Sequence, residues 1–501
     1  MLSVIVFLPL LGAVVMALTP GSRTTLFRWI AAIFSGIDLA LSAVLFFSFN
    51  HGAAGLQFVE RVNWVALPNV GVSYFLGVDG LNLPMVLLTT LLTFLAVLSS
   101  WHIELRTKEY FVLLLVLETG VAGVFTAMDF FLFFLFWEVE LIPMYLLIGI
   151  WGGPRREYAA TKFVVYTLTG SALMLVGIMA LYFYATPHTF DMVTLSHQHY
   201  TPVFASLVFL FLFAGFAVKL PVFPFHTWLP DAHVQAPTAV SVLLAGVLLK
   251  MGGYGMLRVL VGMLPDATRQ WAWLLVVLAI IGVLYGACVS MVQTDLKAMV
   301  AYSSVSHMGY VLLGIASLTA ISLNGAAMQL FSHGLITGML FLLVGVLYEK
   351  AHTRQIPEFG GLAKRTPWLA ALFVMAGLAS LGLPGMSGFV AEFTVFIGSF
   401  STWPVYTILG CVAIVITAGY LLWMLQRIFF GDFNPHWEHL PDIHGVEVVP
   451  LVTLMALIIV VGIYPSIVTD VINNGVAPIV PHSVAAQASS LASIGGFWRL
   501  P

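Results

Sequence analysis

The chain has 501 residues, of which 60% are hydrophobic and only 8% are Asp, Glu, Lys or Arg. A soluble domain typically has about 25% charged residues, so this chain lacks the charge to cover several soluble domains. The net charge of −3 argues against a nucleic-acid binder that depends on phosphate contacts. Two cysteines, Cys288 and Cys411, are too few for an iron–sulfur cluster held by this chain alone or for a disulfide scaffold.

Long apolar runs predict an all-α integral membrane protein with about fourteen transmembrane helices. In chain order the runs cover residues 2–18, 27–49, 81–100, 110–127, 129–150, 161–186, 203–229, 237–263, 271–292, 297–318, 322–348, 367–400, 404–429 and 448–470. They do not alternate with a period of two, which excludes a membrane β-barrel. The first run has no basic segment before it, so we expect it to be a span rather than a cleaved signal peptide.

The distribution of Lys and Arg predicts the orientation in the membrane. Loops that follow odd-numbered helices contain 13 of the 19 basic residues, and the opposite side contains three. Because basic loops stay in the cytoplasm, we expect both termini on the outer side. The other three, Lys219, Lys250 and Arg258, lie within spans.

Weak internal similarities indicate a repeat. MLVGI at 174–178 resembles LLVGV at 342–346, and KLP at 219–221 resembles GLP at 382–384. The last pair places Pro within helices seven and twelve, which we expect to be discontinuous. The pattern predicts two inverted five-helix units, helices 4–8 and 9–13, typical of transporters. The alternative interpretation is that Pro and Gly are simply common in membrane helices.

These units suggest four domains. They are the first three helices (1–109), the first unit (110–263), the inverted second unit (264–430), and a segment with a cytoplasmic loop, the last helix and a tail (431–501).

Ionisable residues within the spans form the candidate site. A charge near the bilayer centre costs about 3 kcal/mol, so such residues are functional candidates by default. They are Glu138, Lys219, Lys250, His307, His333 and Glu392, each on a different predicted helix. Their order, a carboxylate, two amines, two imidazoles and a carboxylate, suits a proton path across the protein. The structural alternatives are a Glu138–Lys219 salt bridge that holds helices together, and histidines bound to Ser or backbone carbonyls.

The surroundings of both lysines support the functional interpretation. Pro221 and Pro224 follow Lys219 and leave backbone carbonyls unpaired, which a membrane tolerates only next to protein or water. Gly246, Gly252, Gly253 and Gly255 flank Lys250 and allow close helix approach.

Two further carboxylates have no assigned role. Glu140 is two residues after Glu138, about 200° around a helix, so the two cannot face the same polar path. One of them is expected to face the axis of the protein and the other a neighbouring helix or subunit. Glu118 lies midway along helix four.

No metal or nucleotide site is predicted. The loop 431–447 contains His436, His439 and His444, but we interpret it as an ordinary polar loop. No glycine-rich phosphate-binding motif is present, and we expect no redox cofactor in this chain.

Four long strings carry a family resemblance: FWEVELIPMYLLIGIWGGPRREYAATKF, KLPVFPFHTWLPDAHVQAPTAVSVLLAGVLLKMGGYG, QTDLKAMVAYSSVSHMGY and LGLPGMSGFVAEF. They resemble the antiporter-like membrane subunits of the proton-pumping NADH–quinone oxidoreductase (respiratory complex I), most closely chain M and the mitochondrial subunit 4. The resemblance is dense over about residues 80–430. It implies fourteen helices with two inverted five-helix repeats.

The resemblance also implies roles for single residues. Glu138 matches the family's helix-five glutamate, which pairs with the helix-seven lysine, here Lys219. Lys250 matches the central helix-eight lysine, and Glu392 the helix-twelve glutamate. His307 and His333 match the histidines between them. We expect no long lateral helix like that of chain L, because about 30 residues of the sequence follow the last predicted span.

The implied function is proton translocation coupled to quinone reduction elsewhere in a complex of the bacterial plasma membrane. NADH, FMN, iron–sulfur clusters and quinone belong to partner subunits. The partners are two other antiporter-like chains, small membrane subunits, the peripheral redox arm and the lipid bilayer, with no nucleic acid. The alternatives are a Na⁺/H⁺ antiporter subunit, the equivalent chain of a ferredoxin- or F420-dependent dehydrogenase or membrane-bound hydrogenase, and a purely structural spacer.

Overall fold

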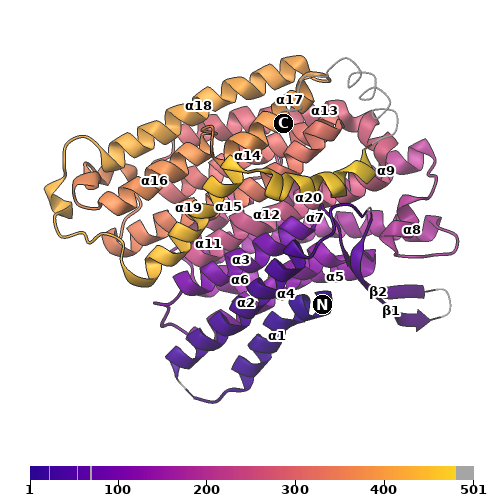
Figure 1. Ribbon diagram of the computed structural model, residues 1–501, viewed down its shortest axis with the longest axis horizontal. Coiled ribbons are helices and arrows are strands. Elements are labelled where there is room, and N and C mark those ends of the chain that lie inside the picture. Colours follow the sequence, from indigo (N-terminus) through magenta and orange to yellow (C-terminus); the bar gives the residue numbers. More distant parts are fainter. Residues whose placement is uncertain (22, 54, 68–69, 481–501) are drawn as a thin grey trace.

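The computed structural model describes residues 1–21, 23–53, 55–67 and 70–480, which form a bundle of long helices that lie mostly alongside one another (Figure 1). The first helices are α1 (Leu2–Leu18), α2 (Thr24–Phe47), α3 (Leu83–Ser99) and α4 (Thr107–Thr126). An antiparallel hairpin, β1 (Gln57–Leu67) and β2 (Val70–Val78), separates α2 from α3. This hairpin was not predicted, because only the long apolar runs on either side of it were assigned.

The middle of the chain contains shorter and interrupted helices. They are α5 (Phe130–Val139), α6 (Leu141–Trp151), α7 (Arg156–Tyr184), α8 (Met192–Ser196), α9 (Pro202–Lys219), α10 (Trp228–Gln235), α11 (Thr238–Leu243), the π-helical η1 (Leu244–Leu248), α12 (Leu249–Gly255) and the π-helical η2 (Met256–Val261).

The last part returns to longer helices, with 3₁₀ turns between α15 and α16, between α18 and α19, and after α20. They are α13 (Pro265–Met291), α14 (Leu296–Ser317), α15 (Ala320–Ala351), η3 (Ile356–Glu358), η4 (Leu362–Lys364), α16 (Pro367–Ser380), α17 (Ser387–Phe400), α18 (Pro404–Phe429), η5 (Pro435–Trp437), η6 (Gly445–Glu447), α19 (Val448–Ile463), α20 (Ser466–Val476) and η7 (Ala477–Ile479).

The predicted class, an all-α integral membrane protein, is confirmed. Each of the fourteen predicted runs contains a helix. Within the described part of the chain, eleven helices are long and apolar enough to cross a membrane unaided. The count of fourteen spans, the inverted repeats and the domain limits stay predictions. The tail beyond residue 480, with Arg499, lies outside the described residues.

Two predicted discontinuities are present. α9 ends at Lys219 and α10 begins only at Trp228, as expected where Pro221 and Pro224 remove backbone donors. α16 and α17 are separated by a turn in which Gly382 has φ +81° and Gly385 φ +91°, values that favour glycine.

A third interruption separates α5 from α6 at Glu140. It was not predicted, since the apolar run 129–150 is continuous. Pro143 lies at the start of α6 and has no N–H to donate to the carbonyl four residues earlier. The helix therefore loses a hydrogen bond at the position of two neighbouring carboxylates.

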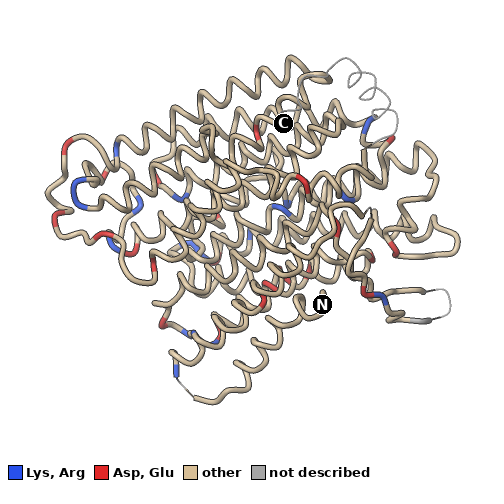
Figure 2. Tube along the Cα trace, viewed as in Figure 1, with Lys and Arg blue, Asp and Glu red and all other residues tan. Residues whose placement is uncertain are grey.

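Burial increases toward the axis of the bundle. In the apolar 18-residue stretch of each helix, the share of buried residues is 100% for Thr238–Val261 and 94% for α14 and α15. It is 39% for α2, α7 and α18. Figure 2 shows charged residues in the middle of the bundle as well as at its ends. The inner helices thus offer positions for ionisable groups away from lipid.

Candidate functional site

Lys219 forms a buried ion pair with Glu140. Its Nζ donates to Glu140 Oε1, and the two side chains are 1% and 0% exposed. Lys219 is the last residue of α9, and Glu140 lies in the interruption between α5 and α6. The ammonium also lies 5.5 Å from the centre of the Trp137 ring and 5.7 Å from that of Phe163. Aromatic rings at these distances further stabilise the cation.

The predicted pairing of Lys219 with Glu138 is therefore wrong. The interruption at Glu140 directs this carboxylate to the axis, whereas Glu138 is partly exposed. The buried Oε1 of Glu138 has no hydrogen-bond partner among the described residues. Of the two carboxylates, Glu140 is the one that faces Lys219. An added Cβ at Gly120 of α4 would lie 3.2 Å from the Glu140 nitrogen, which shows how closely α4 packs there.

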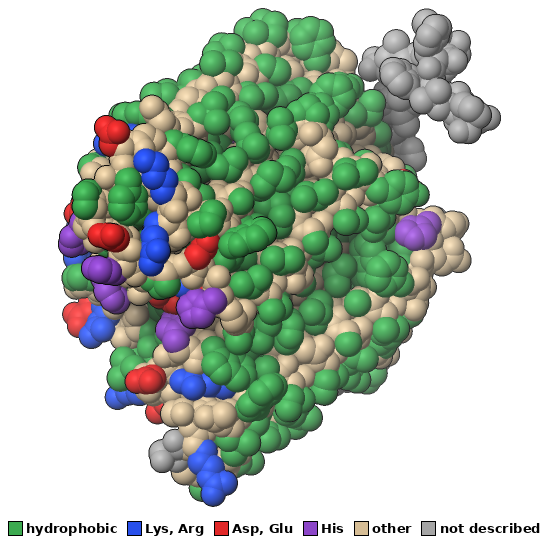
Figure 3. All heavy atoms as spheres, turned by 60° about the vertical axis from the view of Figure 1, so that its left-hand side comes forward, with side chains coloured by type: hydrophobic (Ala, Val, Ile, Leu, Met, Phe, Trp, Pro, Cys, Tyr) green, Lys and Arg blue, Asp and Glu red, His purple; other side chains and the backbone are tan. Residues whose placement is uncertain are grey.

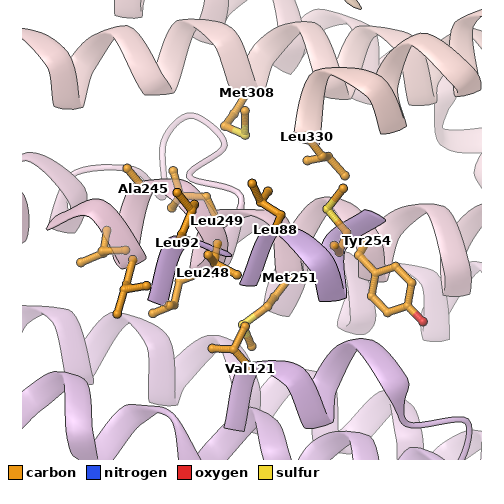
Figure 4. Close-up of a cluster of buried hydrophobic side chains, with 14 of the residues drawn as sticks. Leu88, Leu92, Val121, Ala245, Leu248, Leu249, Met251, Tyr254, Met308 and Leu330 are labelled. Atoms are coloured by element: carbon orange, nitrogen blue, oxygen red, sulfur yellow. The ribbon is translucent and has the colours of Figure 1, made fainter. Parts of the chain in front are cut away.

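Lys250 is enclosed within the bundle. It belongs to α12, a short helix between the π-helical segments η1 and η2, and it is 0% exposed. Figure 4 shows apolar side chains around this helix, among them Leu88, Val121 and Met308. Its Nζ donates to the Ala245 carbonyl and lies 2.8 Å from His333 Nδ1. Single π-helical turns occur frequently at functional sites because they redirect side chains and carbonyls.

The expected close helix approach at the glycines is confirmed. A Cβ at Gly252 would lie 2.6 Å from the backbone nitrogen of Leu220, the residue after Lys219. The helices that carry the two lysines are therefore in backbone contact. Among the described residues, no hydrogen bond or ion pair joins Lys219 to Lys250 directly.

His333, His307 and Glu392 continue from Lys250 across α15, α14 and α17. The rings of His333 and His307 have centres 5.6 Å apart. His307 Nδ1 lies 3.0 Å from Glu392 Oε1, and its Nε2 lies 3.3 Å from Ser380 Oγ. All three side chains are buried.

A small cavity lies beside these three groups. It is lined by His307, His333 and Glu392 together with Gln329 and Ser380, and offers about 10 Å³ to the centre of a water molecule. That is close to the space that one water needs. A water there would bridge the two imidazoles.

The structure thus gathers the predicted residues into two groups. Lys250, His333, His307 and Glu392 form one connected series, and Lys219 forms a second group with Glu140. Glu138 lies beside that pair but does not bind Lys219.

Sequence reasoning missed several buried polar groups. Asp38 of α2 is the neighbour of Glu118, and both are 0% exposed. His233 and Lys297 are also buried. A charge inside an apolar run was the available signal for Asp38, whereas His233 and Lys297 lie at run ends that looked like loop boundaries.

The described residues contain no group of three or more His, Cys, Asp or Glu side chains arranged to hold a metal ion. His444 of the loop that connects α18 to α19 instead contacts Lys350, with 3.4 Å between His444 Nδ1 and Lys350 Nζ.

Comparison with known proteins defines the class. Residues 127–417 match the family model described as NADH:quinone oxidoreductase/Mrp antiporter, transmembrane. The chain belongs to this family of membrane subunits. The structure is similar to a chain of respiratory complex I from Thermus thermophilus with bound NADH, with a TM-score of 0.88, 30% identity and coverage of 96% of this chain and 100% of that one.

Individual relatives show which subunit of such complexes the chain resembles. The NAD(P)H-quinone oxidoreductase chain 4 of Gloeobacter violaceus is 44% identical, over 94% of this chain and 90% of the relative. The NADH-quinone oxidoreductase subunit M of Rhodobacter capsulatus is 43% identical, over 96% of both chains. The resemblance to M-type subunits expected from the sequence is confirmed.

Proposed function

We propose that this chain is the proton-translocating membrane subunit of an NAD(P)H–quinone oxidoreductase, coupled to quinone reduction in other subunits. The observation that carries the proposal is the series of contacts from Lys250 through His333 and His307 to Glu392. These groups are buried on inner helices, where an unused charge would be costly. Membership of the family and the similarity to complex I support it.

The Lys219–Glu140 pair acts as the switch. While the pair is closed, the carboxylate holds the proton on the ammonium. When it opens, the desolvated ammonium favours release of that proton. Bound water carries the proton toward Lys250 on the neighbouring helix. Glu138 is the second carboxylate at this position and is proposed to balance the charge while the pair is open.

The second group passes the proton on. Lys250 donates to His333 Nδ1, and His333 releases a proton from Nε2, which has no partner among the described residues. Water in the small cavity carries it to His307, which donates to Glu392. Neutral imidazole can accept at one nitrogen while it donates from the other, so each histidine returns to its starting charge.

The proposal places the chain among other subunits of a bacterial plasma-membrane complex. Two further antiporter-like chains, small membrane subunits and a peripheral redox arm surround it. NADH, FMN, iron–sulfur clusters and quinone are assigned to those partners. Figure 3 shows Lys, Arg, Asp, Glu and His side chains gathered at one end beside a broad hydrophobic side. This distribution supports a cytoplasmic position for that end, with both termini on the outer side.

The test replaces Lys219 with Ala in the assembled complex. Proton pumping and quinone reduction are measured together in proteoliposomes. A relay loses pumping and most coupled quinone reduction, whereas a structural spacer keeps both. Lys364→Ala is the matched control, because Lys364 is exposed in η4.

Sodium–proton exchange without redox partners is the second candidate, since the matching family model also covers Mrp antiporters. Ion flux in purified complex with and without NADH and quinone separates the two, because only the proposed subunit requires both. A ferredoxin- or F420-dependent complex, or a hydrogenase, is distinguished by mass spectrometry of the co-purifying subunits.

A further inference from the structure

A water-accessible pocket opens at the end of the bundle that we assign to the cytoplasm. It has a volume of about 330 Å³, enough for several water molecules. Its wall combines the end of α3, the end of α15 and the segment around η6, and it contains His102, Glu349 and Glu447. Thr238, the first residue of the helix that leads to Lys250, also lines it.

Glu349 connects the pocket to the interior. Its side chain is 32% exposed, and its Oε1 lies 3.0 Å from His102 Nε2. On the protein side it interacts electrostatically with Lys297. One carboxylate therefore faces both water and a buried amine.

Lys297 is the buried amine next to this wall of the pocket. It is 2% exposed, and its Nζ donates to the Ala236 carbonyl at 2.6 Å, two residues before Thr238. Among the described residues, no carboxylate lies within ion-pair distance of this ammonium. A structural lysine would be expected to have a closer counter-charge in so buried a position.

His233 of α10 is a further buried ionisable group, and it interacts electrostatically with amines on both sides of the proposed route. It is 0% exposed, and its ring stacks on Phe341 with 4.4 Å between ring centres. Both ring nitrogens lack a hydrogen-bond partner among the described residues, although a buried imidazole is normally satisfied. It interacts electrostatically with Lys297 and with Lys250.

We propose that this pocket is the proton uptake site for Lys250, with Glu349, Lys297 and His233 as the successive carriers. Lys219 takes its proton from Lys250 when its pair with Glu140 closes and returns it when the pair opens. The inference rests on the proposed function and names the residues that supply its path. Each step moves one proton: pocket water to the Glu349 carboxylate, then through water to the Lys297 amine, to a His233 ring nitrogen, and to the Lys250 amine. Every donor returns to its starting charge, so no co-reactant other than water is required.

The test uses the whole complex in proteoliposomes, with NADH oxidation and proton uptake recorded together. Lys297→Arg is the decisive variant, because Arg can still donate to Ala236 but does not release its proton. We expect loss of most pumped protons per NADH with Lys297→Arg, and also with Glu349→Gln and His233→Gln. Glu438→Gln is the control, since Glu438 is exposed in the same polar loop region, and it should pump normally.

The outcomes separate two failures. If Lys250→Met abolishes pumping while Lys297→Arg and His233→Gln pump normally, the uptake route is wrong and the path through Lys250 stands. If Lys250→Met itself pumps normally, the proposed function is wrong. Subunit content shows which variants assemble, and an assembled Lys297 or His233 variant is enough to decide the route.

Discussion

The Lys219–Glu140 pair shows how a buried charge depends on its partner. Both side chains are removed from solvent, so water cannot stabilise either charge if its partner is lost. Losing one member of such a pair typically costs about 3–5 kcal/mol, whereas replacing both with apolar groups is often neutral. A small movement of α9 that separates the pair would therefore change the local free energy by several kcal/mol.

This asymmetry gives a prediction for single and double variants. Glu140→Gln should lower the thermal stability of the complex, because the buried Lys219 must then either hold a charge without Glu140 or give up its proton, and both cost free energy. Glu140→Met combined with Lys219→Met should recover most of that stability but not proton pumping. The measurement is the unfolding temperature of purified complex. Equal losses in Glu138→Gln and Glu140→Gln would contradict the pairing.

At single positions, the sequence predicted residue types better than partners. Lys219, Lys250, His307, His333 and Glu392 were identified because ionisable groups in apolar runs are costly. The choice between Glu138 and Glu140 failed because it depends on a helix interruption that the apolar pattern does not reveal.

Glycines set the distance between the helices that carry the lysines. A Cβ at Gly252 would lie 2.6 Å from Leu220 N and 2.7 Å from Phe216 O, both backbone atoms of the α9 region that cannot turn aside. Gly282 of α13 has no atom within 4 Å of an added Cβ. The two glycines are a matched pair for testing this contact.

Gly252→Ala should separate α9 from α12, cost about 1–3 kcal/mol through overpacking and slow proton transfer between the lysines. Gly282→Ala should leave pumping unchanged. Pumping rate and unfolding temperature are measured for both. Normal pumping with Gly252→Ala would show that this contact is not needed for transfer.

The start of α5 offers a test by pH. Asp129 accepts hydrogen bonds from the N–H groups of Phe131, Leu132 and Ser73, but burial raises its pKa to about 6. Its ordinary value is 3.8. The folded protein therefore binds this proton more tightly than the unfolded chain, and the stability contributed falls as pH rises from about 4 to 6.

Asp129→Asn keeps a good capping residue and removes the titration. The stability of the wild type relative to this variant should decrease between pH 4 and pH 7, as measured by unfolding temperature. A difference that stays constant, or that increases with pH, would contradict the raised pKa.

Elements were predicted unevenly for a physical reason. Breaks that Pro and Gly encode, after Lys219 and after Ser380, were visible because these residues remove donors or adopt positive φ. The hairpin of β1 and β2 and the π-helical turns around Lys250 were missed. The segment of β2 does alternate, with apolar residues at 70, 72, 74, 76 and 78, but only the long apolar runs on either side were assigned. The π-helical turns leave no hydrophobic period of their own.

Across the whole molecule, apolar side chains cover the outside, and ionisable side chains lie in the interior and at one end. The outer helices expose apolar side chains, the inner ones hold the ionisable series, and charged side chains gather at one end (Figures 2 and 3). The uptake pocket opens at that end, so water can reach the interior without crossing the lipid-facing surface.

The proposed orientation in the membrane can be tested by chemical labelling from each side. A cysteine in place of exposed His436 should react with a membrane-impermeant maleimide only from the cytoplasmic side, and one in place of exposed His197 only from the outer side. The experiment uses oriented membrane vesicles that contain the complex with Cys288→Ser and Cys411→Ser in this chain. Labelling of both positions from one side would contradict the assigned orientation.

The most direct measurement is the number of protons translocated per NADH oxidised by reconstituted complex in which Lys250 is Met. If protons travel from Lys250 through His333 and His307 to Glu392, this ratio falls sharply while assembly and the redox centres stay intact, and Glu392→Gln gives the same result. An unchanged ratio in both variants would show that protons cross the membrane elsewhere.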